Sequence, residues 1–306
     1  MKKYLVTGGC GFIGLALTKK LIKKSNYVDI LDLPQKIKKI KIKSKYIKLI
    51  EGDISKKETF KKIKKKYHCV YHLAAQTSTR LSELDPDTDI NTNIVGSLNL
   101  CNWARIFKPK RVVFTSSMAV YGKIANKIKE NSNCSPLSIY GLSKLFAEKI
   151  FERLKDEGIK VNIYRLFNAY GPGQDLKNLN QGMFSIYLAQ AVKLNKIKIT
   201  GRLERYRDFV FISDVVDALM LIPKSKKNWI FNIGSGKKIK VRKIIKLILK
   251  NLKPKKIKLK ITKGFYEDTW GSYANNSLML TQGWKPKVNI EKGALLTIND
   301  ALKNKS

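Results

Sequence analysis

The chain has 306 residues, 43% of them hydrophobic, with 62 basic and 23 acidic residues and a formal net charge of +39. This size allows one large α/β domain, or a larger domain with a smaller partner. No apolar run approaches the ~20 residues that cross a bilayer, so we expect no membrane partner. The start lacks a signal-peptide core, and the four cysteines have neither CxxC nor metal-ligand spacing. We therefore expect a reduced, cytoplasmic protein without disulfides and without a metal.

The basic excess has two interpretations, a nucleic-acid partner or lysine-rich solvated faces. Only nine of the basic residues are Arg, and the lysines are spread through stretches such as 36–48, 61–66 and 253–260. Proteins that read phosphates and base edges favour Arg forks, which are scarce here. We therefore expect no nucleic-acid partner, although a basic surface would attract anionic substrates.

Predicted strands and helices alternate through the first half of the chain. The apolar run 3–7 ends in glycines and predicts a buried strand, and residues 12–24 have helical spacing. Further strands are expected at 28–31, 46–50, 69–73, 111–114 and 161–166, and further helices at 55–66, 87–107 and 138–157. This alternation predicts an α/β protein with a doubly wound parallel sheet of the Rossmann type.

After Phe167 the character of the sequence changes. A turn-rich loop, 168–174, precedes helices that we expect near 182–194, 212–222, 240–251 and 290–303, with short strands between them. We therefore expect a dinucleotide-binding domain over residues 1–167. Residues 168–306 would form mainly a smaller substrate-binding domain, some segments of which could return to the sheet.

Three glycines between the first strand and the first helix predict a dinucleotide turn. Gly8 allows the tight turn, Gly11 lets the backbone approach a pyrophosphate, and Gly14 lets helix and strand pack closely. Asp32, at the end of the second strand, would accept both ribose hydroxyls of the adenosine and repel a 2′-phosphate. This favours NAD over NADP, although the three lysines within 36–39 could tolerate a phosphate.

Tyr140 and Lys144 are the most informative pair, because a four-residue spacing places both on one face of a helix. Alone, the pair is typical of an ordinary amphipathic helix. Following a dinucleotide turn and the strand-end run 115–117, it indicates an acid/base centre beside a nicotinamide. A serine hydroxyl at that strand end can bond a substrate oxygen with which Tyr140 exchanges a proton. Because a phenol of pKa ~10 is a poor base at neutral pH, Lys144 and the nicotinamide ring would have to lower its pKa.

Two other strand ends are candidates for cofactor contacts. Asp53 and Ile54 could touch the adenine edge, and the small residues of 73–75 would let a flat cofactor lie close, although both patterns are common at strand ends. We expect His72 to be packed rather than catalytic, and His68 to lie at the surface.

Taken together, these residues resemble the extended short-chain dehydrogenase/reductases of the nucleotide-sugar epimerase/dehydratase group. The resemblance rests on motifs that occur in order over nearly the whole chain, at 7–14, 53–54, 72–75, 93–96, 116–122, 140–144, 165–174, 207–211 and 283–286. It is more specific to the superfamily than to a substrate.

The resemblance implies roles for the matching positions. Ser117 would be the catalytic hydroxyl, Tyr140 the proton-exchanging residue, and Lys144 its partner on the nicotinamide ribose. Tyr140 and Lys144 would thus also bind the cofactor, together with Gly8, Gly11, Phe12, Ile13, Gly14, Asp32, Asp53, Ile54, Leu73, Ala74, Ala75, Asn93, Thr115 and Phe167. Substrate would be held by Ser117, Met118, Asn168, Gln181, Arg207 and Asp268, with Arg207 on the diphosphate.

Two departures from the family pattern bear on the reaction. The 4,6-dehydratases carry an Asp-Glu pair directly after the catalytic Thr, and related decarboxylases keep the Glu. Here Met118 and Ala119 cannot transfer a proton, which disfavours dehydration and, less strongly, decarboxylation. Many relatives also place an Arg near the C-terminus as a second diphosphate clamp. The stretch 263–268 contains none, although Lys263 could substitute for it.

We therefore expect NAD-dependent epimerisation of a nucleotide sugar, first of all a UDP-hexose at C4, through a transient 4-keto intermediate. Another epimerase, a reductase or a decarboxylase of the same family is the alternative, and a non-catalytic NAD-binding protein is the alternative from a different class. The resemblance also implies a homodimer in which helices 87–107 and 138–157 pair across a two-fold axis.

Overall fold

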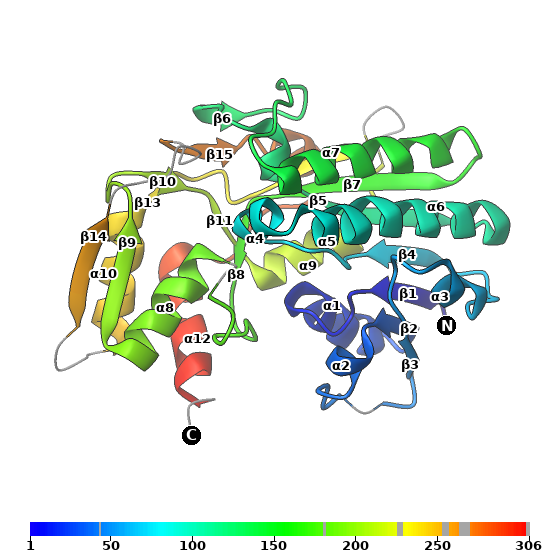
Figure 1. The fold of residues 1–306 in the computed structure, drawn as a ribbon, viewed down its shortest axis with the longest axis horizontal. Coiled ribbons are helices and arrows are strands. Elements are labelled where there is room, and N and C mark those ends of the chain that lie inside the picture. Colours follow the sequence, from blue (N-terminus) through cyan, green and yellow to red (C-terminus); the bar gives the residue numbers. More distant parts are fainter. Residues whose placement is uncertain (43, 180–181, 225–228, 253–256, 263–269, 304–306) are drawn as a thin grey trace. The chain divides into compact units, whose positions relative to one another are not determined.

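A seven-stranded sheet carries most of the first half of the chain. The computed structural model describes residues 1–42, 44–179, 182–224, 229–252, 257–262 and 270–303. The strand order is β12-β7-β5-β4-β1-β2-β3 (Figure 1). The bounds of these strands are Lys3–Thr7 (β1), Tyr27–Asp32 (β2), Ile47–Glu51 (β3), Cys69–His72 (β4), Arg111–Ser117 (β5), Lys160–Leu166 (β7) and Ile230–Ile233 (β12). Neighbouring strands from β5 to β3 pair in parallel, which confirms the predicted α/β fold.

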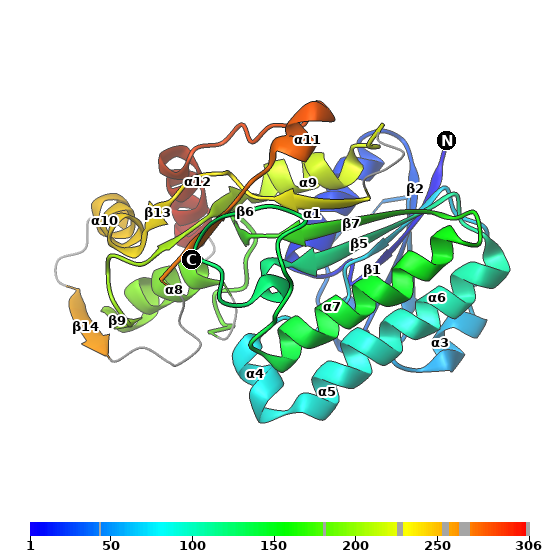
Figure 2. The ribbon, with the colours of Figure 1, turned by 90° about the horizontal axis from the view of Figure 1, so that it is seen from above.

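The sheet is buried on both faces, as a parallel sheet requires. In β1 the successive residues Tyr4, Leu5 and Val6 are all buried. Leu5 packs in a core with residues of helices α3, α6 and α7, such as Phe60 and Trp103. These helices cover one face of the sheet and α1 covers the other (Figure 2). The carboxyl ends of β1, β2, β4 and β5 therefore lead into loops along one edge, where ligands of such sheets bind.

The helices associated with these strands are α1 (Phe12–Ile22), α2 (Pro34–Ile37), α3 (Lys57–Lys61), α4 (Thr79–Leu84), α5 (Pro86–Ile90), α6 (Gly96–Phe107) and α7 (Ile139–Glu152). A π-helical turn, Asn91–Val95, joins α5 to α6, so the helix expected at 87–107 is divided into three parts. Single 3-10 turns at 118–121 and 153–155 follow β5 and α7. The helix predicted at 55–66 is too long, since α3 spans only Lys57–Lys61. It ends at Lys61, and the Ile63 carbonyl accepts a hydrogen bond from the Trp103 indole at 2.7 Å.

The remaining strands lie outside this sheet. The strands are β6 (Asn126–Ile128), β8 (Asn168–Tyr170), β9 (Lys196–Thr200), β10 (Tyr206–Arg207), β11 (Phe209–Phe211), β13 (Ile239–Lys240), β14 (Lys258–Thr262) and β15 (Ser272–Ala274). They pair two by two, as β6 with β15, β8 with β11, β9 with β14 and β10 with β13. The helices are α8 (Met183–Leu194), α9 (Ile212–Met220), α10 (Val241–Leu252), α11 (Ser277–Thr281) and α12 (Ile290–Lys303).

The chain divides into two compact units. One comprises residues 1–122, 134–165 and 222–231, and the other comprises 123–133, 166–221 and 232–306. The catalytic candidates Ser117, Tyr140 and Lys144 all belong to the first unit. The division of labour between cofactor and substrate binding stays a prediction.

Candidate active site

The glycine turn after β1 is packed so tightly that side chains are excluded. Gly8 has a φ of +69°, and a Cβ there would lie 2.6 Å from the backbone nitrogen of Ala74. A Cβ on Gly14 would collide with the Gly8 carbonyl. The Gly8 amide donates to the Leu31 carbonyl at 2.8 Å, so the turn is fastened to the end of β2. Small residues at 8, 14 and 74 therefore bring three backbone segments together where a ligand can reach main-chain atoms.

Helix α1 begins directly after this turn, and its N-terminal amides lack a side-chain cap. The N-cap residue is Gly11, which has no side chain to accept from the first-turn N–H groups of Phe12, Ile13 and Gly14. Uncapped N–H groups and the positive end of the helix dipole form an anion site. This arrangement fits the pyrophosphate of a dinucleotide.

The Asp32 carboxylate lies beside the same turn. One oxygen accepts the Cys10 amide at 2.9 Å and the other accepts the Leu33 amide at 2.8 Å. The Cys10 thiol also hydrogen-bonds this carboxylate, which has about four acceptor positions, so acceptor capacity remains for a ribose hydroxyl. The two predicted partners of the adenine differ, since Ile54 is buried and Asp53 is partly exposed. Ile54 is buried in the core, and its carbonyl accepts from Asn99, while Asp53 accepts the Ser55 amide at 2.9 Å.

The structure brings Ser117 and Tyr140 together, as predicted. Ser117 is the last residue of β5, which extends three residues beyond the predicted end, and its hydroxyl accepts the Ala119 amide at 3.1 Å. A hydrogen bond joins the Ser117 and Tyr140 side chains. Met118 follows Ser117 directly, in the 3-10 turn. Serine and phenol therefore meet at the carboxyl end of a central strand.

Helix α4, which was not predicted, holds the first turn of α7 in place. The Ile139 amide donates to the Glu83 carboxylate at 2.8 Å, and the Tyr140 amide donates to the Ser82 hydroxyl at 3.0 Å. The N-cap residue Ser138 accepts the Gly141 amide at 3.1 Å. These side chains satisfy helix N–H groups that would otherwise be unpaired and fix the backbone that carries Tyr140.

Burial moves the pKa values of the catalytic pair in opposite directions. It raises the pKa of Tyr140 to about 12, against the lowering effect of the Ser117 hydrogen bond, and the Asp89 charge raises it further. Burial lowers the pKa of Lys144 to about 7, while the charges of Asp89 and Glu148 oppose this shift. The Lys144 Nζ lies 4.3 Å from the centre of the Phe114 ring. The charge of Lys144 is therefore sensitive to its surroundings near neutral pH.

Asn93, a predicted cofactor contact, joins three segments of the protein. Its Nδ2 lies 3.0 Å from the Gln76 carbonyl, 3.1 Å from Asp89 Oδ2 and 3.1 Å from Ser143 Oγ. Its Oδ1 accepts the Gln76 amide at 3.0 Å. Asn93 thus ties the loop after β4 to α5 and to α7, beside Lys144. Contact with a cofactor stays a prediction for Asn93.

Of the other predicted residues around β4, His72 is packed as expected, whereas His68 is less exposed than expected. His72 is buried, with Nδ1 2.7 Å from the Thr7 hydroxyl and Nε2 3.3 Å from the Ser97 hydroxyl. Burial lowers its pKa to about 3, so this packed imidazole is neutral at physiological pH. Thr115 donates to the His72 carbonyl at 3.2 Å. His68, expected at the surface, is half-buried with its ring edge against Tyr4.

In the second unit, the predicted substrate residue Asn168 contacts Asp208, the residue that directly follows another predicted substrate residue, Arg207. The backbone amide and the side-chain Nδ2 of Asn168 both donate to the Asp208 carbonyl, at 3.1 and 2.8 Å. Arg207 directly precedes Asp208, and its guanidinium donates to the Tyr206 carbonyl at 2.8 Å. The Asp208 carboxylate is fully buried and accepts four hydrogen bonds from residues Ser235, Gly236 and Ala274.

Three further predictions concern this unit. Phe167 is buried, and its amide donates to the Ile233 carbonyl at 3.0 Å. Gln181 and Asp268 lie outside the described residues, as does the stretch 263–268 that lacks an Arg. Their roles therefore stay predictions.

Several polar residues around α7 were missed by sequence reasoning. Glu148 and Arg165 form a buried ion pair, with Nη2 2.7 Å from Oε2, and Ser116 donates to Glu148 at 2.5 Å. Asp89 is fully buried near Lys144 and Tyr140. The one signal for Asp89 was its position four residues before Asn93, a spacing that places both on one side of a helix.

Two absences hold for the part of the chain that the structure describes. Within it, no group of three His, Cys, Asp or Glu residues is placed to hold a metal ion. Its helices are also too short or too polar to cross a membrane. All four cysteines are free thiols.

Comparisons with known proteins agree on the relatives of this chain. The profile of the NAD dependent epimerase/dehydratase family matches residues 4–234. A putative UDP-glucose 4-epimerase of Methanocaldococcus jannaschii is 34% identical over 303 residues, covering 96% of this chain and 97% of that protein. A UDP-glucuronate 4-epimerase of Thermodesulfobacterium geofontis is 30% identical, covering 99% and 97%. The crystal structure of Thermotoga maritima UDP-glucose 4-epimerase with UDP-glucose has a TM-score of 0.90 at 29% identity, covering 99% of this chain and 100% of that chain.

Proposed function

Because this chain belongs to the NAD-dependent epimerase/dehydratase family, we propose that it is a nucleotide-sugar 4-epimerase acting on a UDP-hexose. The observation that carries the proposal is the hydrogen-bonded Ser117–Tyr140 pair at the end of β5, followed by the proton-inert residues Met118 and Ala119. The relatives named above act on UDP-sugars at C4, which supports the same substrate class for this chain.

NAD would be held by residues of the first unit. The amides at the start of α1 and the Gly8 turn would bind its pyrophosphate, and the Asp32 carboxylate would accept from the adenosine ribose. A 2′-phosphate would face the Asp32 charge, which favours NAD over NADP. When bound, NAD supplies reversible two-electron oxidation at the sugar carbon.

The protein's own residues would handle the proton. Ser117 would donate to or accept from the C4 oxygen, which places that oxygen within reach of the Tyr140 phenol. Tyr140 would take the C4 hydroxyl proton on oxidation and return it on reduction. A protonated Lys144 beside the phenol would favour the phenolate, because an adjacent positive charge lowers a phenol pKa. Beyond the two-electron oxidation and reduction that NAD would supply, epimerisation would require of the protein's own residues only hydrogen bonding and proton transfer at the C4 oxygen, because no group leaves the sugar.

The absence of an acid after Ser117 separates this reaction from its rivals in the family. Dehydration and decarboxylation would call on a proton-transferring residue at the positions that Met118 and Ala119 occupy. A reductase would use the same Ser117 and Tyr140 but would consume a nicotinamide in each turnover. A non-catalytic NAD-binding protein would have no use for the Ser117–Tyr140 hydrogen bond.

The decisive experiment incubates the purified protein with UDP-glucose, UDP-N-acetylglucosamine or UDP-glucuronate, without added nicotinamide, and separates the products by chromatography. We expect conversion of one of these sugars to its C4 epimer at constant mass. Net oxidation or reduction of added nicotinamide, or release of carbon dioxide, would contradict the proposal in favour of the other family reactions. Binding of NAD without any turnover would favour the non-catalytic alternative.

We further propose that the protein is a homodimer. Apolar side chains are exposed on two helices, α6 and α7. On α6, Leu98 and Ile106 lie about two turns apart, and on α7, Leu142 and Phe146 lie about one turn apart. Phe146 is 56% exposed, and α6 and α7 lie side by side (Figure 2). Two such helices from each of two copies would bury these residues in a four-helix bundle. Light scattering should give about twice the mass of one chain, and Phe146→Glu should give the mass of a monomer.

A further inference from the structure

Asp89 is a buried carboxylate to which the chemistry above assigns no task. It lies in α5, is fully buried, and is bound on one oxygen only. Its Oδ2 accepts from Gln76 Nε2 at 2.8 Å and from Asn93 Nδ2 at 3.1 Å. Its Oδ1 has no hydrogen-bond partner among the described residues. A buried carboxylate is costly unless a positive charge compensates for it.

The hydrogen-bond network leads from Asp89 directly to the catalytic helix. Asn93 bonds both the Asp89 carboxylate and the Ser143 hydroxyl, and Ser143 immediately precedes Lys144. The Ser143 hydroxyl also lies 3.0 Å from the Tyr140 carbonyl. The Asp89 carboxylate is thus linked through Asn93 of the π turn to Ser143 of α7, the helix that carries Tyr140 and Lys144.

We propose that Asp89 is a positioning residue whose negative charge keeps Lys144 protonated in the catalytic centre. The inference rests on the proposed function, since the protonated Lys144 is what makes Tyr140 usable as a base.

The other charged and titratable groups near Lys144 are already engaged. Glu148, one turn further along α7, is paired with Arg165 of β7, with Nε–Oε1 and Nη2–Oε2 distances of 2.9 and 2.7 Å. His72 of β4 is neutral, because burial lowers its pKa to about 3. The contacts of Asp89, in contrast, are amides and a hydroxyl rather than a cation. Its charge therefore acts on Lys144 and, in the same sense, on Tyr140.

Asp89→Asn tests the proposal with almost no change in shape. The new amide oxygen can accept from Gln76 and Asn93 as Oδ2 does now, and the new NH₂ replaces the oxygen without a partner. Removing a negative charge favours the deprotonated forms, so the pKa values of both Tyr140 and Lys144 should fall. We expect the whole pH profile of kcat/KM to move toward acid by roughly one pH unit. The control is Asp87→Asn, which removes an exposed charge from the same helix and should leave the profile in place.

A second measurement does not depend on the sugar. NAD affinity, followed by tryptophan fluorescence between pH 6 and 9, should change with the protonation of Lys144, and its midpoint should fall in Asp89→Asn. In a Lys144→Gln background the Asp89 substitution should have no such effect. An unshifted profile and an unshifted NAD midpoint in folded Asp89→Asn protein would overturn the proposal, whatever the loss in kcat.

The remaining outcomes are also distinguishable. If the wild type turns over no UDP-hexose but the NAD midpoint shifts in Asp89→Asn, the proposed function fails and the role of Asp89 stands. If Asp89→Asn does not fold, Asp89→Ser removes the same charge from a smaller side chain and the same shift is expected.

Discussion

The two ends of helix α7 carry charges in opposite surroundings. From Ile139 to Glu148 the charged residues of α7, Lys144 and Glu148, are buried, and Glu148 pairs with Arg165 of β7; the side chains of Arg165 and Glu148 are only 5% and 1% exposed. Beyond its C-terminal end the charges lie at the surface, and the Arg153–Asp156 pair is 75% and 73% exposed. Charges in water cost little to leave unpaired, whereas buried charges must be compensated. Tyr140 and Lys144 lie in the part of α7 where an uncompensated charge would destabilise the folded protein.

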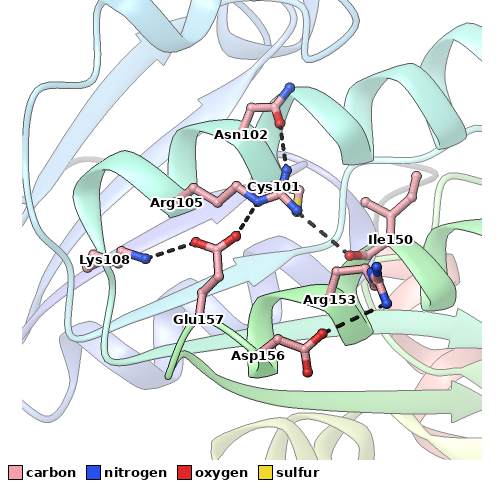
Figure 3. Close-up of polar contacts among 8 residues, drawn as sticks. All are labelled: Cys101, Asn102, Arg105, Lys108, Ile150, Arg153, Asp156 and Glu157. Carbon is pink, nitrogen blue, oxygen red and sulfur yellow. Dashed lines mark hydrogen bonds and ion pairs between the residues drawn. The ribbon is translucent and has the colours of Figure 1, made fainter.

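The exposed end serves a different purpose (Figure 3). Glu157 lies between Arg105 Nε at 2.6 Å, in the last turn of α6, and Lys108 Nζ at 2.9 Å, at the C-cap of that helix. The Cys101 thiol also donates to the Ile150 carbonyl at 3.7 Å. These contacts fasten the ends of α6 and α7 to each other. The two ion pairs of Glu157 can be lost one at a time, because water replaces each missing partner, whereas the Cys101 thiol is buried.

The largest effect should follow from a change at the buried end that leaves the fold intact. Tyr140→Phe removes only the phenol oxygen, so proton exchange is lost while packing is kept. We expect turnover of the UDP-sugar to fall about 10³-fold, with NAD affinity unchanged within a factor of about three. Steady-state kinetics and NAD titration on the same preparation measure both. Substantial residual turnover would show that Tyr140 is not the proton acceptor.

Glu148→Gln tests the cost of an uncompensated buried charge. The change leaves the Arg165 guanidinium buried beside the Tyr121 ring without its counter-charge. We expect the free energy of unfolding in urea to fall by about 3–5 kcal/mol. A loss below about 1 kcal/mol would mean that the buried and exposed ends of α7 do not differ in the way described.

His72 should make the stability of the folded protein depend on pH. The folded-state pKa of about 3 lies below the ordinary value of 6.5, so the unfolded state binds the proton first as pH falls. The stability that the neutral imidazole provides is complete above pH 6.5 and is lost progressively toward pH 3. From pH 7.5 to pH 5 the loss should be about 2 kcal/mol. Urea unfolding should be measured at pH 7.5 and at pH 5. The free energy of unfolding should depend less on pH in His72→Asn than in the wild type. In His68→Asn, at the half-exposed site, the pH dependence should change less.

The smallest effect should come from Glu157→Gln, the exposed counterpart of Glu148→Gln. We expect the free energy of unfolding to change far less than in Glu148→Gln, because pairs at the surface contribute little to stability. Adding 0.5 M NaCl should remove most of the difference, because surface pairs are screened by salt. If Glu157→Gln cost as much as Glu148→Gln, burial would not be the deciding variable.

The sequence predicted the sheet and the Ser117–Tyr140 pair because both depend on local patterns. Apolar runs that end in glycine or polar residues mark strand ends, and a Tyr four residues before a Lys marks one face of a helix. The Gln76–Asp89 and Glu83–Ile139 contacts were not predicted, because they span 13 and 56 residues and no local pattern records them; the only local signal was the four-residue spacing of Asp89 and Asn93. The site residues Gln181 and Asp268 rest on family resemblance alone.

The π turn at 91–95 has a consequence for the length of this segment. A π turn closes a hydrogen bond over five residues instead of four, so the segment holds one residue more than a regular helix needs. Loss of a single residue there would restore an unbroken α-helix and rotate α5 against α6 by about 100°. Asp89 would then turn away from Gln76 and Ser143, although every side chain of the site would still be encoded. Substitutions are therefore not the only route to an inactive protein, since a one-codon deletion in the π turn, distant from Tyr140 in sequence but linked to α7 through Asn93, would have the same result.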